Sequence, residues 1–407
     1  MPGILNRLDL RPLRPRDKHE PHRAASSLEL FFDLVFVVAV SLAAESLHHL
    51  ETDGHAAAGV GAYLMVFFAI WWAWMNFTWF ATAFDNDDWL YRVTTIAQMA
   101  GVLVLAAGVP SAMQEGTLSV VTYGYVIMRL AMVSQWLRVA ADAPEYRKTA
   151  LRYAAGITIV QALWVLRLLL PDSLGVASFI VLALAEMAVP IIAERNAVTP
   201  WHNHHIAERY GLFTLVVLGE GLLGSANAII DGLRDAEHVY PLILLAACAL
   251  VIVAMMWWMY FQVPQHDKFG SLRRSLTFGY THYVIFAAAA AVSAGIEVGV
   301  SQQSGGVELS PVAAAATLTV PVAVFVLATW ALAIRPTARP VTNVVLPVAA
   351  GLIALSALLE MAWPTAGPAA AAVLTALLLV VVVVTLGAAG TTERQRGPRL
   401  STKAPLN

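Results

Sequence analysis

Charged residues are scarce in this chain. Aspartate, glutamate, lysine and arginine make up 13% of its 407 residues, about half of the share that a soluble domain carries. Hydrophobic residues make up 59%, and the mean hydropathy is +0.68. This composition argues against a soluble globular domain and predicts a polytopic membrane protein. The formal net charge is −2, so we expect no nucleic-acid partner.

Cysteine and the common metal signatures are also scarce. The single cysteine, Cys248, lies in an apolar run, which excludes a disulfide framework and predicts a thiol that only packs. The zinc signature H-E-x-x-H is missing, although His204, His205 and Glu208 are close on one helix face and are weak candidates for metal ligands. We therefore expect no cofactor and no resident metal, and the sequence indicates no catalytic set of residues.

Long apolar windows are abundant. Twelve of them are long enough to cross about 30 Å of hydrocarbon as a helix. We therefore predict an all-α membrane protein with about twelve transmembrane helices. The windows are 27–48, 58–82, 91–110, 117–139, 148–170, 174–194, 206–230, 240–263, 275–299, 309–334, 339–362 and 367–389.

The basic residues predict the orientation of these helices. All but three of the 25 lysines and arginines fall in segments that are cytoplasmic if the N-terminus lies inside. The exceptions are Arg129, within a span, and Arg167 and Arg234. Both termini are therefore expected to be cytoplasmic. We interpret residues 1–26 as a basic tail and not as a cleaved signal peptide, because acidic residues interrupt the apolar stretch that follows.

A weak internal repeat relates the two parts of the chain. Residues 29–38 resemble residues 208–217, and the tryptophan-rich segment 71–74 resembles 257–260. Two parallel six-helix units would place a transport site between them, near the membrane midplane. The expected organisation is a cytoplasmic tail (1–26), a first membrane half (27–194), a cytoplasmic linker (195–205), a second membrane half (206–390) and a C-terminal cytoplasmic tail (391–407).

Two carboxylates stand near the start of the first span. Glu29 and Asp33 are one helical turn apart, so they lie on the same face. An ionised group inside a span costs about 2.5–3.5 kcal/mol on insertion scales, and such a residue is a functional candidate by default. The pair requires a shared proton, a cation from another helix or a metal.

A second polar stretch opens the seventh predicted span. Arg209 and Glu220 lie on one stripe of this helix, and Glu220 is about 21 Å along it, near the bilayer middle. We therefore select Glu220 as the candidate proton carrier; the alternative is a fixed ion pair that only joins helices. The glycines at 219, 221 and 224 formally fit a dinucleotide fingerprint, but inside a span they indicate close helix packing.

Other spans offer partners for these acids. Arg129 lies about 16 Å from the inner end of its span, so a carboxylate should face it, and Asp33 and Glu220 are the candidates. His282 lies at useful depth beside Tyr280; the alternative is a histidine that only packs between helices. Asp88 is expected to cap the third helix and to pair with Arg92. The secondary candidates are Asp85, Asp88, Arg92, His205 and Glu186.

Tryptophans are more numerous than an interfacial belt requires. We favour anchoring and core packing for them, with a platform that stacks a ligand as the alternative. The residues concerned are Trp71, Trp72, Trp74, Trp79, Trp257 and Trp258.

Taken together, these segments resemble the bacterial low temperature requirement protein A family. The resemblance covers about residues 27–300 and implies an integral protein of the bacterial cytoplasmic (inner) membrane with a link to growth in the cold. The segments that carry it are Glu29–Phe36, Trp71–Trp74, Phe84–Arg92, Met128–Leu130, His205–Thr214 with Gly219–Glu220, and Tyr280–His282.

The leading hypothesis is a proton- or ion-coupled secondary transporter. We expect the lipid bilayer and an unidentified small molecule or ion as partners, and a homo-oligomer is left open. The alternatives are a membrane-embedded enzyme acting on a lipid or isoprenoid, which is the less favoured class, and a non-catalytic sensor or scaffold for cold adaptation. The expected polar network consists of Glu29, Asp33, Arg129, Glu208, Arg209, Glu220, Tyr280 and His282.

Overall fold

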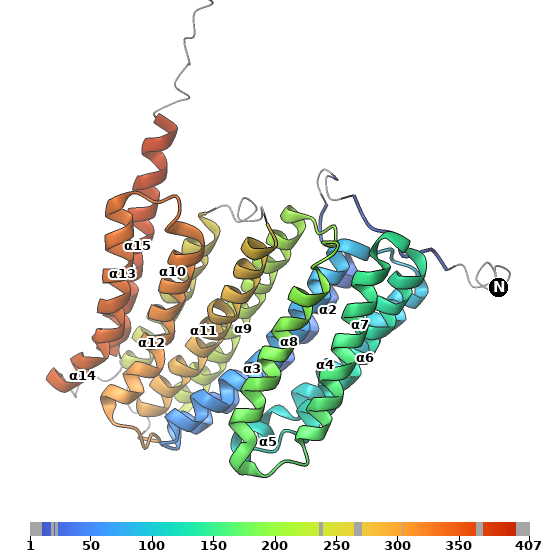
Figure 1. Ribbon diagram of the computed structural model, residues 1–407. Helices are drawn as coiled ribbons and strands as arrows, with labels where there is room; N and C mark the ends of the chain where they lie inside the picture. Colours follow the sequence, from blue (N-terminus) through green and yellow to red (C-terminus); the bar gives the residue numbers. More distant parts are fainter. Residues whose placement is uncertain are drawn as a thin grey trace, which may run out of the picture.

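The helices of this protein lie side by side and share one direction of tilt (Figure 1). The computed structural model describes residues 10–17, 20, 23–235, 239–263, 271–303, 305–363 and 369–395, and in that part of the chain all regular secondary structure is helical. The long helices are α2 (Ser27–Thr52), α3 (Ala56–Phe84), α4 (Trp89–Ala107), α6 (Ser119–Asp142), α7 (Arg147–Arg167), α8 (Gly175–Ala193), α9 (Asn203–Asp235), α10 (Val239–Phe261), α11 (Leu272–Gln303), α12 (Pro311–Thr329), α13 (Pro340–Leu355) and α15 (Ala369–Gln395).

Eleven candidate membrane spans occur among the described residues, each long and apolar enough to cross a bilayer. The remaining predicted window, 117–139, is occupied by α6, whose 24 residues are about 36 Å long but include Arg129. The prediction of an all-α polytopic membrane protein is confirmed. Of the two predicted tails, residues 1–9, 18–19, 21–22 and 396–407 lie outside the described residues.

The centre of the bundle is built from α2, α3, α9 and α11. Of the apolar window of α11, 83% is buried inside the protein, whereas α8 is the least enclosed span at 28%. Figure 1 shows α4, α6 and α7 on one side of this centre and α10, α12, α13 and α15 on the other. Within the centre, α2 and α9 contact each other directly and so join the two sides of the bundle.

Glycines allow two helix pairs to pack unusually closely. A Cβ atom at Gly124 of α6 would lie 2.3 Å from the backbone nitrogen of Leu105 on α4. A Cβ atom at Gly295 of α11 would lie 2.4 Å from the carbonyl oxygen of Thr317 on α12. Small residues of this kind let the backbones of membrane helices approach each other. Substituting either glycine would force the two helices apart.

The same pattern of neighbours occurs before and after the start of α9. Helix α2 contacts α3 and α4, and α9 contacts α10 and α11; α6 packs between α4 and α7, and α12 packs between α11 and α13. This pattern is compatible with two related units. The repeat itself and the five-part division of the chain remain predictions.

An N-terminal strap, residues 10–17, lies across one end of the bundle, which we call the strap face. The side chain of Leu13 is fully buried, and its backbone N–H donates to the Asp142 carboxylate at 2.9 Å. The backbone N–H of Arg16 donates to the carbonyl of Ala83 at 2.9 Å. In Figure 1 the end of α15 is at this same face, whereas the short helices α5 (Val109–Gln114) and α14 (Leu359–Ala362) are at the opposite one.

Candidate functional site

Glu29 is positioned by the way in which α2 begins. Ser26 is the N-cap: its hydroxyl accepts from the backbone N–H of Glu29 at 3.3 Å, and its own backbone N–H donates to the Glu29 carboxylate at 2.8 Å. This reciprocal capping box fixes both the first turn of the helix and the carboxylate itself. Asp33 follows one turn later on the same face.

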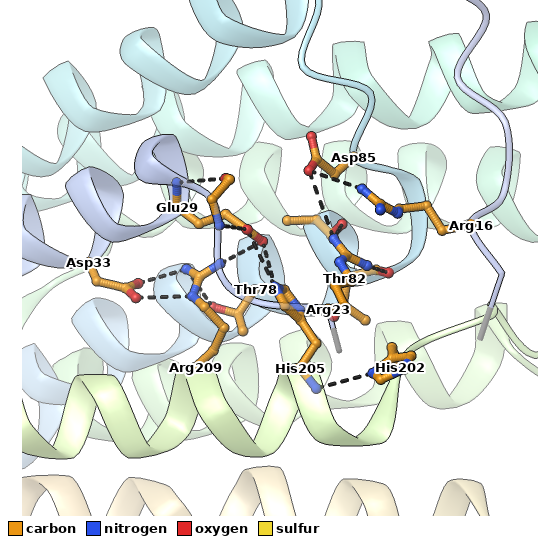
Figure 2. A network of polar contacts seen from close by, with 12 residues as sticks. Arg16, Arg23, Glu29, Asp33, Thr78, Thr82, Asp85, His202, His205 and Arg209 are labelled. Atoms are coloured by element: carbon orange, nitrogen blue, oxygen red, sulfur yellow. Dashed lines mark hydrogen bonds and ion pairs between the residues drawn. The ribbon is translucent and has the colours of Figure 1, made fainter. Parts of the chain in front are cut away.

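Helix α9 presents a matching pair of side chains. Glu29 and His205 are each two residues after the first residue of their helix, and Asp33 and Arg209 are each six residues after it. The two pairs are therefore about 6 Å apart along the helices. We call these four residues, Glu29, Asp33, His205 and Arg209, the α2–α9 ladder. Figure 2 shows them facing one another.

The deeper pair of the ladder is a bidentate ion pair. The Arg209 guanidinium donates from Nε to Asp33 Oδ2 at 3.0 Å and from Nη2 to Oδ1 at 2.7 Å. The indole N–H of Trp74 donates to Oδ1 at 2.7 Å, and the Thr78 hydroxyl lies 3.4 Å from Nη2. Asp33 is 2% exposed and Arg209 is fully buried. Two parallel charge-assisted bonds in this setting fix the geometry of the pair.

The shallower pair joins Glu29 to an imidazole and to the same arginine. Arg209 Nη1 lies 2.9 Å from Glu29 Oε1, and His205 Nε2 lies 3.3 Å from the same carboxylate. The other ring nitrogen of His205 contacts the Thr82 hydroxyl. Both nitrogens of His205 thus have a partner inside the protein, and its ring is fully buried.

Charged groups from the strap face form a rim on one side of the ladder (Figure 2). Arg23 donates to the carbonyls of Thr82 and Ala81, and its guanidinium lies 3.9 Å from Asp85. Arg16 lies 3.5 Å from Asp85. Burial raises the pKa of Asp85 to about 6, although both guanidinium groups oppose this shift.

The side chains of the ladder and the rim together have a net charge of one negative unit. The ladder has two carboxylates and one guanidinium, and the rim balances Arg16 and Arg23 against Asp85 and Glu20, which Arg16 binds at 2.8 Å. With its histidines neutral, the network therefore lacks one positive charge. One proton or one monovalent cation would complete it.

A second buried ion pair joins α6 and α8. Arg129 Nη2 donates to Glu186 at 2.9 Å. The same carboxylate accepts from the Trp72 indole at 2.9 Å and from the Gln161 amide at 2.7 Å. The expected pairing of Arg129 with Asp33 or Glu220 is therefore wrong, because α6 and α8 both pack against α7, and α8 supplies the carboxylate that reaches Arg129.

Glu220 lies apart from both ion pairs. It is eleven residues beyond Arg209 on α9, about 16 Å along the helix, and it is partly exposed. Glu208 is exposed and accepts a hydrogen bond from the backbone of Ala25. The expected continuous network is thus divided into separate groups.

His282 and Tyr280 have local partners. A carbonyl oxygen only accepts, so His282 Nδ1, 2.7 Å from the Phe278 carbonyl, carries the hydrogen, and Nε2 accepts from the Tyr260 hydroxyl at 2.8 Å. This neutral ring is fully satisfied. Tyr280 donates to the carbonyl of Met187 at 2.9 Å. The predicted polar network grouped Tyr280 with the acids of α2, and this contact gives it a different partner.

The acidic loop between α3 and α4 was only partly predicted. Asp88 is the N-cap of α4 and accepts from the backbone N–H of Tyr91 at 2.8 Å, as expected. The expected pair of Asp88 with Arg92 is wrong: Arg92 binds Asp87 at 2.7 and 2.8 Å, and Asp88 binds Arg138. Asp87 has a positive φ of 51°.

No group of three or more histidine, cysteine, aspartate or glutamate side chains in the described part of the chain is arranged to hold a metal ion. His204, His205 and Glu208, the weak candidates, do not form such a group. His205 instead binds Glu29 and Thr82.

Sequence reasoning missed the contribution of α3. Its Trp74, Thr78 and Thr82 contact Asp33, Arg209 and His205 respectively. These three residues are spaced by four, so they form one polar stripe on a helix that is otherwise apolar. The spacing of this stripe could have predicted that α3 contributes to the site. No sequence pattern predicted the role of Arg23, because it lies before the first span.

Comparison with known proteins gives two matches. The sequence profile described as "Bacterial low temperature requirement A protein" matches residues 24–385. An uncharacterized protein of Rhizobium meliloti (strain 1021) is 28% identical over 259 residues, which are 61% of this chain and 61% of that relative. The chain therefore matches less than two thirds of the relative's length. The profile covers the ladder and the Arg129–Glu186 pair.

Proposed function

This chain belongs to the bacterial low temperature requirement A family, and from its buried charges we propose that it is a proton- or ion-coupled secondary transporter. The coupling site in this proposal is the α2–α9 ladder, between a first membrane half (27–194) and a second one (206–390). We further propose that the protein resides in the bacterial cytoplasmic membrane with both termini inside.

The observation that carries the proposal is the charge imbalance of the ladder. Two carboxylates share one guanidinium, and all three groups are at most 2% exposed. A structural ion pair needs one charge of each sign; Glu29 also closes the capping box of α2, but its charge exceeds what the single guanidinium of the ladder balances. Uncompensated charge inside membrane spans is typical of ion and proton pathways.

The two pairs of the ladder are assigned different roles. Asp33 accepts three hydrogen bonds, two from Arg209 and one from Trp74, so it is the fixed partner. Glu29 has His205 beside it, and a proton bound between them would complete the charge of the network. Neutralising Glu29 weakens its attraction to Arg209, and this weakening would loosen α2 from α9.

The ladder is closed on both sides in this conformation. At the strap face, Arg23 and the strap residue Arg16 bind the end of α3 beside the ladder, and all four ladder side chains are buried. Toward the other face, aromatic rings of three helices fill the centre: Trp74 of α3 stacks on Phe213 of α9 at 4.3 Å, and Phe213 meets Phe286 of α11 at 5.0 Å. A transport cycle would open one side at a time.

Ion flux into liposomes tests the proposal. Purified protein is reconstituted with a dye inside that is selective for H⁺, Na⁺ or K⁺, and a membrane potential drives entry of the cation that the dye reports. We expect flux above protein-free vesicles for the wild type and a loss of about tenfold or more for Glu29→Gln. Glutamine still fits the capping box of α2 but removes the uncompensated charge.

Glu220→Gln is the matched control, since it neutralises a carboxylate on the partner helix outside the ladder. It should retain flux within about twofold. If Glu220→Gln abolishes flux and Glu29→Gln does not, the coupling site is misplaced. Wild-type flux equal to that of empty liposomes for all three cations would contradict transport and favour the sensor or scaffold hypothesis.

A further inference from the structure

A cleft lined by aromatic rings opens near the strap face, between α3, α6, α7, α8 and the start of α11. Its enclosed free volume is about 40 Å³, and the space including its open mouth is about 550 Å³. We call it the aromatic cleft. Its rings belong to Trp79, Phe80, Trp136, Tyr153, Trp201 and Tyr280.

One carboxylate lies in this cleft, and its partners there are neutral. Glu194 is 4% exposed and accepts from the backbone N–H and hydroxyl of Thr199 at 2.7 and 2.8 Å, and from the Tyr153 hydroxyl at 2.9 Å. None of the lining residues, all of which are described, is basic. Arg273 and Arg274, which precede the lining residue Ser275, are exposed.

The position of Glu194 adds to the negative potential of the cleft. It is the C-cap of α8, so the negative end of the helix dipole lies beside its carboxylate. Burial raises the pKa of Glu194, and the hydrogen bonds from Thr199 and Tyr153 counteract that shift only in part. A cation in the cleft would offset both unfavourable effects.

A second feature of the cleft is a hydroxyl without a partner. Ser275 of α11 lines the cleft and is fully buried, and its Oγ has no hydrogen-bond partner in the described structure. A buried hydroxyl is normally hydrogen-bonded. An orphan group of this kind beside an aromatic wall and a carboxylate points to a ligand with a polar arm.

We propose that the aromatic cleft binds an organic cation of the quaternary ammonium type, with a short hydroxyl or ester arm that reaches Ser275. Aromatic faces attract weakly hydrated ammonium groups, and Glu194 supplies the opposite charge. A bare metal ion fits less well, since the cleft offers one carboxylate whose oxygens already accept three hydrogen bonds. The proposal concerns binding and does not depend on transport.

This cation has two sources, a free solute or the headgroup of a choline lipid. An apolar groove shares Tyr280 with the cleft and is lined by Phe68, Trp71, Phe179 and Tyr283 among others. That groove is suited to an acyl chain, so both sources are compatible with the geometry, and the test separates them.

Calorimetric titration of the protein in a maltoside detergent with choline chloride tests the proposal. The neutral isostere of choline, 3,3-dimethyl-1-butanol, is the matched ligand control. We expect saturable binding of choline and at least about tenfold weaker binding of the isostere. Glu194→Gln and Trp201→Leu should each weaken choline binding about tenfold or more, and Glu145→Gln, an exposed acid in the α6–α7 loop, should leave it within about twofold.

The same titration in nanodiscs identifies the source. If choline binds in phosphatidylglycerol nanodiscs but not in phosphatidylcholine nanodiscs, the lipid headgroup competes for the cleft and is the source. Equal choline binding in both kinds of nanodisc indicates a free solute. Equal affinity for choline and its isostere would overturn the proposal. So would unchanged choline affinity in both Glu194→Gln and Trp201→Leu.

Discussion

Asp85 and Asp87 are two residues apart in one loop, and their surroundings shift their pKa values in opposite directions. Burial raises the pKa of Asp85 to about 6, against an ordinary value of 3.8. The hydrogen bonds from Arg92 lower the pKa of Asp87. Stability linked to protonated Asp85 is complete below about pH 4 and is lost as the pH rises through about 6, whereas the contribution of Asp87 is lost as the pH falls.

We therefore predict that Asp85→Asn changes the pH dependence of thermal unfolding. As the pH rises from about 4.5 to about 7.5, the melting temperature of the wild type should fall relative to that of Asp85→Asn, since the variant has no proton to release at this position. Asp87→Asn is the control, because asparagine tolerates the positive φ of this position. Asp87, whose pKa is lowered from 3.8, is ionised throughout this range, so the variant should be less stable than the wild type by an amount that does not change with pH. Parallel melting curves of the wild type and Asp85→Asn across this range would contradict the assignment.

The sequence could predict how deep in the bundle the partner of Arg129 lies, but not which helix supplies it. Arg129 is ten residues after the start of α6, and Glu186 is eleven residues after the start of α8, so the two lie at the same level in the bundle. The sequence gives this depth through helix length. It does not say which helices are neighbours, and the packing of α6 and α8 around α7 decides the pair.

Among the elements, the N-terminal strap binds the ends of α3 and α6 at the strap face. Leu13 anchors it in the bundle, and Arg16 hydrogen-bonds the end of α3. The strap has no apolar run of its own, so the sequence indicated only a basic tail. Its packing depends on α3 and α6 already being assembled.

We predict that loosening the strap exposes the ladder. In a Cys248→Ala background, Thr82→Cys should react slowly with a membrane-impermeant maleimide, because position 82 is fully buried. Adding Leu13→Asp, which buries an unpaired charge, should raise the labelling rate about tenfold or more. An exposed cysteine, Glu145→Cys, should label equally fast with and without the Leu13 substitution. An unchanged rate at position 82 would show that the strap does not cover the site.

At the scale of the whole molecule, the apolar windows predicted the helices well. A long apolar segment in a bilayer must satisfy its backbone internally, and only a helix does so within one segment. The window 117–139 also predicted α6, although Arg129 and Gln135 interrupt its hydropathy and it is not among the eleven candidate spans. The ladder was half predicted: all four of its residues were selected, but their pairing follows from the parallel register of α2 and α9, which periodicity alone does not give.

The bias of basic residues predicts the side of the membrane on which the strap face lies. A fluorescent-protein fusion after residue 395 should be fluorescent, and an alkaline phosphatase fusion at the same point should be inactive. Fusions in the loop that contains Gly116, between α5 and α6, should give the reverse pattern. Phosphatase activity at the C-terminal fusion would invert the proposed orientation.

The central claim is that the acids of α2 and the arginine of α9 meet inside the membrane. A double-mutant cycle of Asp33→Asn and Arg209→Gln, followed by thermal unfolding in detergent, measures this directly. Each single change leaves a buried charge without its partner and should destabilise by about 3–5 kcal/mol, so the double variant should be more stable than the sum predicts by about 1–3 kcal/mol. Additivity within about 0.5 kcal/mol would mean that the two residues do not touch and would contradict the account.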